Sequence, residues 1–278
     1  MNRKGDKETG RQGERGKAYI FSLSACLLVF LSFLFMGVCR TAAAGEVFVL
    51  HLPGIGGHMY MDDEMVKGLR EGGVRGRIEI YNWTCGDPGL PALHARRRNL
   101  EQAGKIAQLI VEEETEHPEI SVQITAHSAG AGLAVWALER LPEGEMVENV
   151  VMIAPALSPD YDLTGALRHV RGSMYVIYSE FDSLVLGVGT TLFGTIDGVQ
   201  MEAAGKVGFV RPAGGDEGEY RKVMQVPYEP EWARYGNYGD HIGGMMRRFV
   251  EAVVTPMVME GCVKATTRGV DVELAGGR

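Results

Sequence analysis

Apolar residues in this 278-residue chain occur either in short continuous runs or in stripes that repeat every three or four positions. Such runs predict buried β-strands, and such stripes predict helices that pack one face on a sheet. Strands are expected at residues 46–51, 77–83, 122–126, 150–153, 174–178 and 222–226. Helices are expected at about 62–70, 100–114, 131–141, 166–170 and 242–253, and short helical turns around 191–193. Asp62 or Asp63 is expected to cap the first of these helices. This alternation of strands and helices predicts an α/β fold with a mostly parallel sheet covered on both faces.

The first 44 residues differ from the rest. Scattered basic residues precede an apolar stretch at 18–38, and the small residues Thr41 to Ala44 follow. This order predicts a secretory signal peptide, with an uncleaved membrane anchor through 18–38 as the alternative. A lipoprotein anchored at Cys39 fits less well. We therefore expect a signal or anchor at 1–44, one domain at 45–258 and a loosely held tail at 259–278, with the domain exported to the periplasm or beyond the cell.

Charge and cysteine content narrow the range of partners. Residues 1–44 contain seven basic and three acidic residues, so the remainder has 21 basic and 33 acidic residues and a net charge of −12. Nucleic acid and anionic membrane surfaces are therefore unfavourable partners. Cys85 and Cys262 could pair in an oxidising compartment, and the sequence leaves this open. We expect no metal site and no cofactor, and the oligomeric state is not indicated.

A strand-to-helix turn around Ser128 is the strongest candidate for chemistry. Ala126 and Gly130 lie two residues either side of this serine, as a tight turn between a strand and a helix requires. The turn would present the serine hydroxyl above the strand ends and direct the Ala129 N–H into the same space. We expect His127 to point away from the cleft and to support the turn.

Three other loops carry candidate side chains. The segment 53–57 is glycine-rich, but it lacks the residues of a P-loop and the spacing of a dinucleotide site. Asp182 follows an apolar strand, and Glu180 and Asp162 are the alternatives for an acid. His241 lies in a glycine-containing loop before the last helix. His58 could face the cleft, but we expect a loop histidine without a catalytic role. The arginine run at 96–98 is expected to be solvated and not to bind a ligand.

The turn, the glycine-rich loop and the order Ser128, Asp182, His241 resemble the α/β-hydrolase family over residues 46–257. Ala126 replaces the usual glycine of the nucleophile turn, and Pro53 replaces the histidine of the family's His-Gly-x-Gly-Gly loop. The resemblance implies about six strands, because the first two strands of the family sheet are missing, and no cap domain. It also implies a catalytic triad of Ser128, Asp182 and His241, with an oxyanion hole formed by the backbone N–H groups of Ile55 and Ala129.

Such a triad indicates a serine hydrolase that cleaves an ester, of the carboxylesterase or lipase kind, through an acyl-enzyme. The expected partner is a small-molecule or lipid-like acyl substrate. Two alternatives stay open: a catalytically inactive binding protein with the same fold, and an envelope acyltransferase that differs only in the acceptor.

Overall fold

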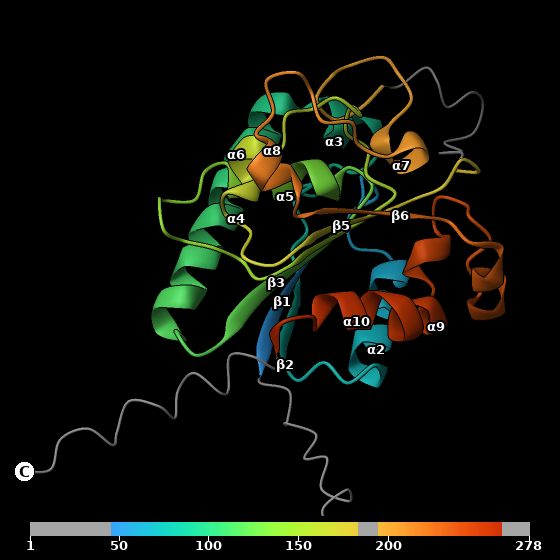
Figure 1. Cartoon of the computed structure of the whole chain (residues 1–278), viewed down its shortest axis with the longest axis horizontal. Coiled ribbons are helices and arrows are strands. Elements are labelled where there is room, and N and C mark those ends of the chain that lie inside the picture. Colours follow the sequence, from blue (N-terminus) through green and yellow to red (C-terminus); the bar gives the residue numbers. More distant parts are fainter. Residues whose placement is uncertain (1–45, 183–193, 263–278) are drawn as a thin grey trace, which may run out of the picture. The chain divides into compact units, whose positions relative to one another are not determined.

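The computed structural model describes residues 46–182 and 194–262 (Figure 1). Its strands are β1 (Val47–Leu52), β2 (Gly76–Ile80), β3 (Ser121–His127), β4 (Val150–Ile153), β5 (Met174–Tyr178) and β6 (Val223–Pro227). Its α-helices are α2 (Tyr60–Glu71), α3 (Leu90–His94), α4 (Arg96–Glu116), α5 (Gly130–Leu138), α6 (Thr164–Leu167), α7 (Ala204–Val207), α8 (Glu217–Tyr220), α9 (Arg247–Phe249) and α10 (Thr255–Val258). Two 3₁₀ turns, η2 (Pro230–Tyr235) and η3 (Gly243–Met245), and a π-helical turn, η4 (Val250–Val254), complete the elements.

The strands form one six-stranded sheet in the order β2-β1-β3-β4-β5-β6. Every neighbouring pair is parallel, which confirms the predicted sheet and its six strands. After β1 the chain moves to β2 on one side, and it then returns to β3 on the other side of β1. The order therefore reverses between β1 and β3, where open α/β sheets form a crevice at the carboxyl ends of their strands.

Helices cover both faces of the sheet, as predicted. Side chains alternate along β1, so that Val47 and Val49 join one apolar cluster while Phe48, Leu50 and Leu52 join the other. The first cluster contains residues of α2, α9 and α10, and the second contains residues of α4 and α5. Figure 1 shows these two groups of helices on opposite sides of the sheet.

Helix α5 is buried along its whole length, and not on one face only. Its predicted stripe does face the core, but α4 and Tyr161 also cover residues on its other face. The indole N–H of Trp136 donates to the Tyr161 hydroxyl at 3.1 Å, and the Arg96 guanidinium lies over the Trp136 ring. A helix that is apolar on all sides is expected in such a position between a sheet and another helix.

Two predicted boundaries on the β1 side are wrong. Helix α2 begins at Tyr60, so Asp62 lies in its first turn and is not its N-cap; the carboxylate accepts the Met59 backbone N–H at 2.7 Å. Strand β2 ends at Ile80 and not at residue 83. The Asn82 side chain accepts the backbone N–H of Thr84 at 3.1 Å, and this local bond stabilises a turn where the strand would otherwise continue.

The final helix also differs from its prediction at 242–253. Gly243 and Gly244 form a 3₁₀ turn packed closely on Asn237 and Ile153, and regular helix starts only at Arg247. The π-helical turn η4 then precedes Pro256, which has no N–H to continue the usual hydrogen-bond ladder. The apolar stripe thus marks a packing surface that three different backbone conformations share.

Two predictions lie outside the described residues. They are the signal or anchor at 1–44 and the helical turns expected at 191–193. No helix within residues 46–182 and 194–262 has the length and apolar content needed to cross a bilayer. Cys262 is buried, and the Glu260 carbonyl accepts the Asn149 side-chain amide at 2.7 Å, so the chain stays packed as far as Cys262, three residues beyond the start of the predicted tail.

Candidate active site

Ser128 occupies a strained turn between β3 and α5. Its φ of 54° lies in the left-handed region, which costs a non-glycine residue about 1–2 kcal/mol. The turn stays bonded to the sheet, because the Ser128 N–H donates to the Ile153 carbonyl at 2.9 Å and the Ser128 carbonyl accepts the Ala156 N–H at 3.0 Å. A side chain at Gly130 would overlap the carbonyl oxygens of Leu52 and Pro53. Close contact with the loop that follows β1 therefore requires a glycine at position 130, two residues after the serine.

The side chains of Ser128, His241 and Asp182 form one hydrogen-bonded chain. His241 Nε2 lies 2.9 Å from Ser128 Oγ, and His241 Nδ1 lies 2.9 and 3.1 Å from the two carboxylate oxygens of Asp182. A carboxylate only accepts, so Nδ1 carries the proton and Nε2 can accept the serine hydroxyl. The side chains of His241 and Asp182 are 12% and 8% exposed, which leaves the imidazole shielded but accessible.

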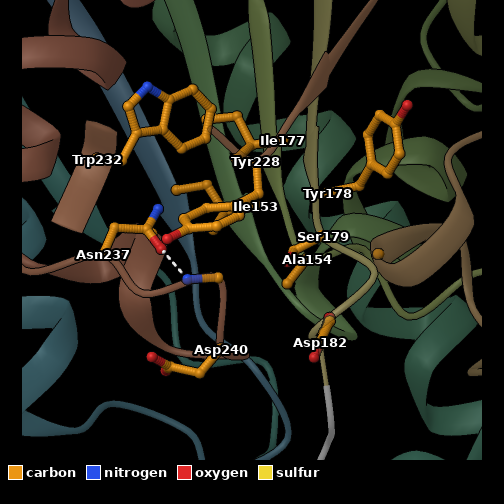
Figure 2. Close-up of a pocket in the computed structure, with 13 residues that line it drawn as sticks. Ile153, Ala154, Ile177, Tyr178, Ser179, Asp182, Tyr228, Trp232, Asn237 and Asp240 are labelled. Carbon is orange, nitrogen blue, oxygen red and sulfur yellow. Dashed lines mark hydrogen bonds between the residues drawn. The ribbon is translucent and has the colours of Figure 1, made fainter. Parts of the chain in front are cut away.

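Asp182 is held by the turn that follows β5. Its backbone N–H donates to the Ser179 carbonyl at 2.9 Å, and the Phe181 N–H donates to Ser179 Oγ at 3.1 Å. A small cavity of ≈ 20 Å³ lies beside this turn. Among its lining side chains, Figure 2 shows Trp232 at one end and Asp182 and Asp240 at the other. A cavity of this volume has room for about one water molecule, so it is too small for a substrate.

The two alternative acids lie elsewhere. Asp162 accepts the backbone N–H and the hydroxyl of Thr164, at 3.0 and 2.6 Å, and these bonds hold the pKa of its carboxyl below the usual value. Glu180 is exposed to solvent. Of the three acids considered, Asp182 is the one that contacts His241.

The two backbone N–H groups predicted to form an oxyanion hole belong to Ile55 and Ala129. Ile55 is in the loop after β1, and Ala129 follows the serine at the start of α5. Neither N–H has a hydrogen-bond acceptor among the described residues. Fixed donors of this kind stabilise negative charge on a tetrahedral intermediate. The Ile55 carbonyl accepts the Gly89 N–H at 2.6 Å, which ties this loop to the segment before α3.

His127 precedes the serine, and its side chain is buried. The residue is among those that line the cavity beside Ser128. It supports the turn as expected, because Nε2–H donates to the His241 carbonyl at 2.9 Å and the two imidazole rings lie 4.9 Å apart. Burial, together with the nearby charge of His241, lowers the pKa of His127 to about 3. The ring is therefore neutral at physiological pH.

A buried polar network beneath the site escaped the sequence analysis. His51 Nδ1 lies 2.9 Å from Thr125 Oγ1, and His51 Nε2 lies 2.9 Å from an Asp62 carboxylate oxygen. All three side chains are almost fully buried. His51 and Thr125 are paired neighbours on β1 and β3, a register that the sequence does not reveal. The remaining histidine considered, His58, is exposed and pairs with Asp63 at 2.8 Å.

No group of three His, Cys, Asp or Glu residues in 46–182 and 194–262 is arranged to hold a metal ion. Cys85 and Cys262 are both free thiols, the first exposed and the second buried. The pairing that the sequence left open is thus not formed in this structure.

Comparisons with known proteins place these features in context. Neither a family model nor a curated protein matches the sequence. Among solved structures, Aspergillus fumigatus lipase B is similar over 78% of this chain, with 15% identity and a TM-score of 0.48; the match covers 53% of the lipase, so this chain spans about half of its length. A lipase-esterase related protein from Clostridium acetobutylicum matches 76% of this chain and 94% of its own, with 11% identity and a TM-score of 0.45.

The strand order and the positions of three loops identify the fold of the described domain. Its six parallel strands reverse their order beside a strained serine turn. The acid follows β5, and the histidine follows β6, at the same edge of the sheet. A sheet of this order, with a strained serine turn between β3 and α5, has the α/β-hydrolase fold.

Proposed function

We propose that this protein is a serine hydrolase that cleaves a carboxylic ester through an acyl-enzyme. The observation that supports this most directly is the hydrogen-bonded chain from Ser128 through His241 to Asp182. Serine is a weak nucleophile unless a neighbouring base accepts its proton, and the base needs a partner that fixes its tautomer. The three side chains meet both requirements.

In the proposed reaction, Ser128 Oγ attacks the ester carbonyl while His241 Nε2 accepts the hydroxyl proton. The resulting oxyanion is stabilised by the N–H groups of Ile55 and Ala129. The intermediate collapses with cleavage of the bond to the alkoxy oxygen, and His241 returns the proton to that leaving group. Water then attacks the acyl-enzyme by the same route, which releases the carboxylic acid and restores Ser128. Asp182 stays ionised and stabilises the imidazolium throughout.

Two other functions share this site. An acyltransferase would use an acceptor hydroxyl or amine in place of water in the second step. An inactive binding protein would keep the fold without turnover. The hydrolase is favoured over the binding protein because a strained serine, a base and an acid are all retained. Export of the domain, expected from residues 1–44, is part of the same proposal.

The test is labelling by a fluorophosphonate probe, which modifies only an activated serine. Wild type should be labelled at Ser128, whereas Ser128→Ala should not be labelled. Ser158→Ala is a matched control, because Ser158 is also buried and bonded to a carboxylate, that of Asp197, but has no imidazole in its hydrogen bonds. This control should label as wild type does. Asp182→Asn should fold normally and lose about 10³–10⁴-fold in turnover of p-nitrophenyl esters. Near-full turnover by Asp182→Asn, or labelling of Ser128→Ala, would refute the assignment.

A further inference from the structure

A cavity of ≈ 520 Å³ opens beside Ser128 and His241. It lies between the loop after β1 and the turn after β3, at the reversal of the strand order. Its size is within the range of sites for small-molecule ligands, about 300–1,000 Å³. This cavity, and not the narrow one behind Asp182, can therefore hold the acyl group of a substrate.

The large side chains along this cavity are apolar. Ile55, Met59 and Met61 come from the loop after β1 and the start of α2, and Ile242 follows the candidate catalytic histidine. Met59 and Ile242 are 53% and 44% exposed, so they have surface left to bury against a ligand. Methionine is unbranched and adapts to flexible apolar partners. A linear hydrocarbon chain suits such a wall.

The charges around the cavity are all of one sign. The described residues that line it include the carboxylates of Asp62 and Asp240 but no lysine or arginine. Burial acts to raise the pKa of Asp62, but the hydrogen bond and charge of His51 and the hydrogen bond from the Met59 backbone together outweigh this effect, so the pKa is lowered and Asp62 stays ionised. An anionic group that entered this space would lose its hydration without gaining a cationic partner.

We propose that the site accepts neutral esters with a linear apolar acyl chain, bound along Met59, Met61 and Ile242, and rejects acyl chains that end in a carboxylate. This substrate class rests on the proposed serine hydrolase function. Each methylene group buried along the wall should raise kcat/KM by up to about fourfold, until the chain exceeds the cavity. A terminal carboxylate should reverse this gain.

The test compares two esters with the same six-carbon acyl length, p-nitrophenyl hexanoate and the mono-p-nitrophenyl ester of adipic acid. Wild type should favour the hexanoate in kcat/KM by at least about 100-fold, and p-nitrophenyl acetate should be poorer than the hexanoate. Met61→Lys adds a cation to the wall and should reduce the hexanoate preference by tenfold or more. Met224→Lys is the control, since Met224 is 45% exposed on β6 and does not line the cavity. It should keep the wild-type ratio.

A second readout does not depend on turnover. Hexyl and ω-carboxypentyl fluorophosphonates both carry six carbons and differ by the same terminal charge, and their rates of reaction with Ser128 should follow the same order. The substrate class would be overturned by equal rates for the two probes, by equal kcat/KM for the two esters, or by an unchanged ratio of kcat/KM in Met61→Lys. If Ser128 is still labelled in that case, the hydrolase proposal stands. If neither probe labels Ser128 and no ester is hydrolysed, the hydrolase proposal fails, and the substrate class fails with it.

Discussion

Replacing His127 by glutamine should make the fold less sensitive to acid. The His127 side chain is buried, and its pKa is about 3 in the folded protein against 6.5 for an unperturbed histidine. Between these two values the unfolded chain binds a proton that the folded protein does not bind. Stability is therefore lost as the pH falls from about 6.5 towards 3, and it is recovered as the pH rises.

The magnitude follows from the difference in pKa. Each pKa unit corresponds to 1.36 kcal/mol, so at pH 4, about 2.5 units below the unfolded value, the histidine lowers the free energy of unfolding by roughly 3 kcal/mol. This is a large part of the 5–15 kcal/mol that is typical of a domain. Glutamine has no titrating group, but its amide N–H can still donate to the His241 carbonyl, so the turn should persist.

Urea unfolding at pH 7 and pH 4 measures the effect. The decrease in unfolding free energy between these pH values should be smaller by about 3 kcal/mol in His127→Gln than in wild type. Other groups titrate in both proteins and cancel in this comparison. His94→Gln is the control, because His94 is exposed at the end of α3, and it should behave as wild type does. An equal decrease in His127→Gln and wild type would refute the buried neutral imidazole.

Two further predictions concern packing and thiol exposure. Gly130→Ala should lower the free energy of unfolding by about 2–3 kcal/mol, since its methyl group would overlap the carbonyl oxygens of Leu52 and Pro53. Gly104 lies in open space within α4, so Gly104→Ala should raise the free energy of unfolding by about 0.5–1 kcal/mol. Urea unfolding of both variants measures these changes, and equal changes would contradict the close contact at Gly130. Iodoacetamide should modify exposed Cys85 quickly but Cys262 only on unfolding, because burial raises the pKa of the Cys262 thiol. Mass spectrometry of the labelled peptides checks this, and rapid native labelling of Cys262 would contradict its burial.

The strands at the centre of the sheet were the most predictable elements. Strands β4 and β5 match their predicted bounds because both are short apolar runs covered on both faces, a pattern with few alternative structures. The acid and the histidine could be placed in the loops after β5 and β6 for the same reason. Parallel strands end at one edge of the sheet, so the order of the chain already restricts which loops can meet.

The polar network beneath the site could not be predicted from local pattern. Asp62 was expected to be a helix cap, and a carboxylate in the first turn of a helix fits that pattern equally well. Its contact with His51, and that of His51 with Thr125, depends on the register of β1 against β3 and on the entry angle of α2. These are long-range features. The orientation of His127 is similar, because its partner is a carbonyl 114 residues away.

The location of the site follows from how the chain passes through the sheet. From β1 the chain continues into α2 on one face, and from β3 it continues into α5 on the other face. The loops after these two neighbouring strands therefore diverge and leave a crevice between them, into which Ile55 and Ser128 face. The close contact of Gly130 with Leu52 and Pro53 links the two loops at the base of this crevice. A larger residue there would push the Ser128 turn away from the candidate oxyanion donor of Ile55, so one position couples the stability of the turn to the geometry of the proposed reaction.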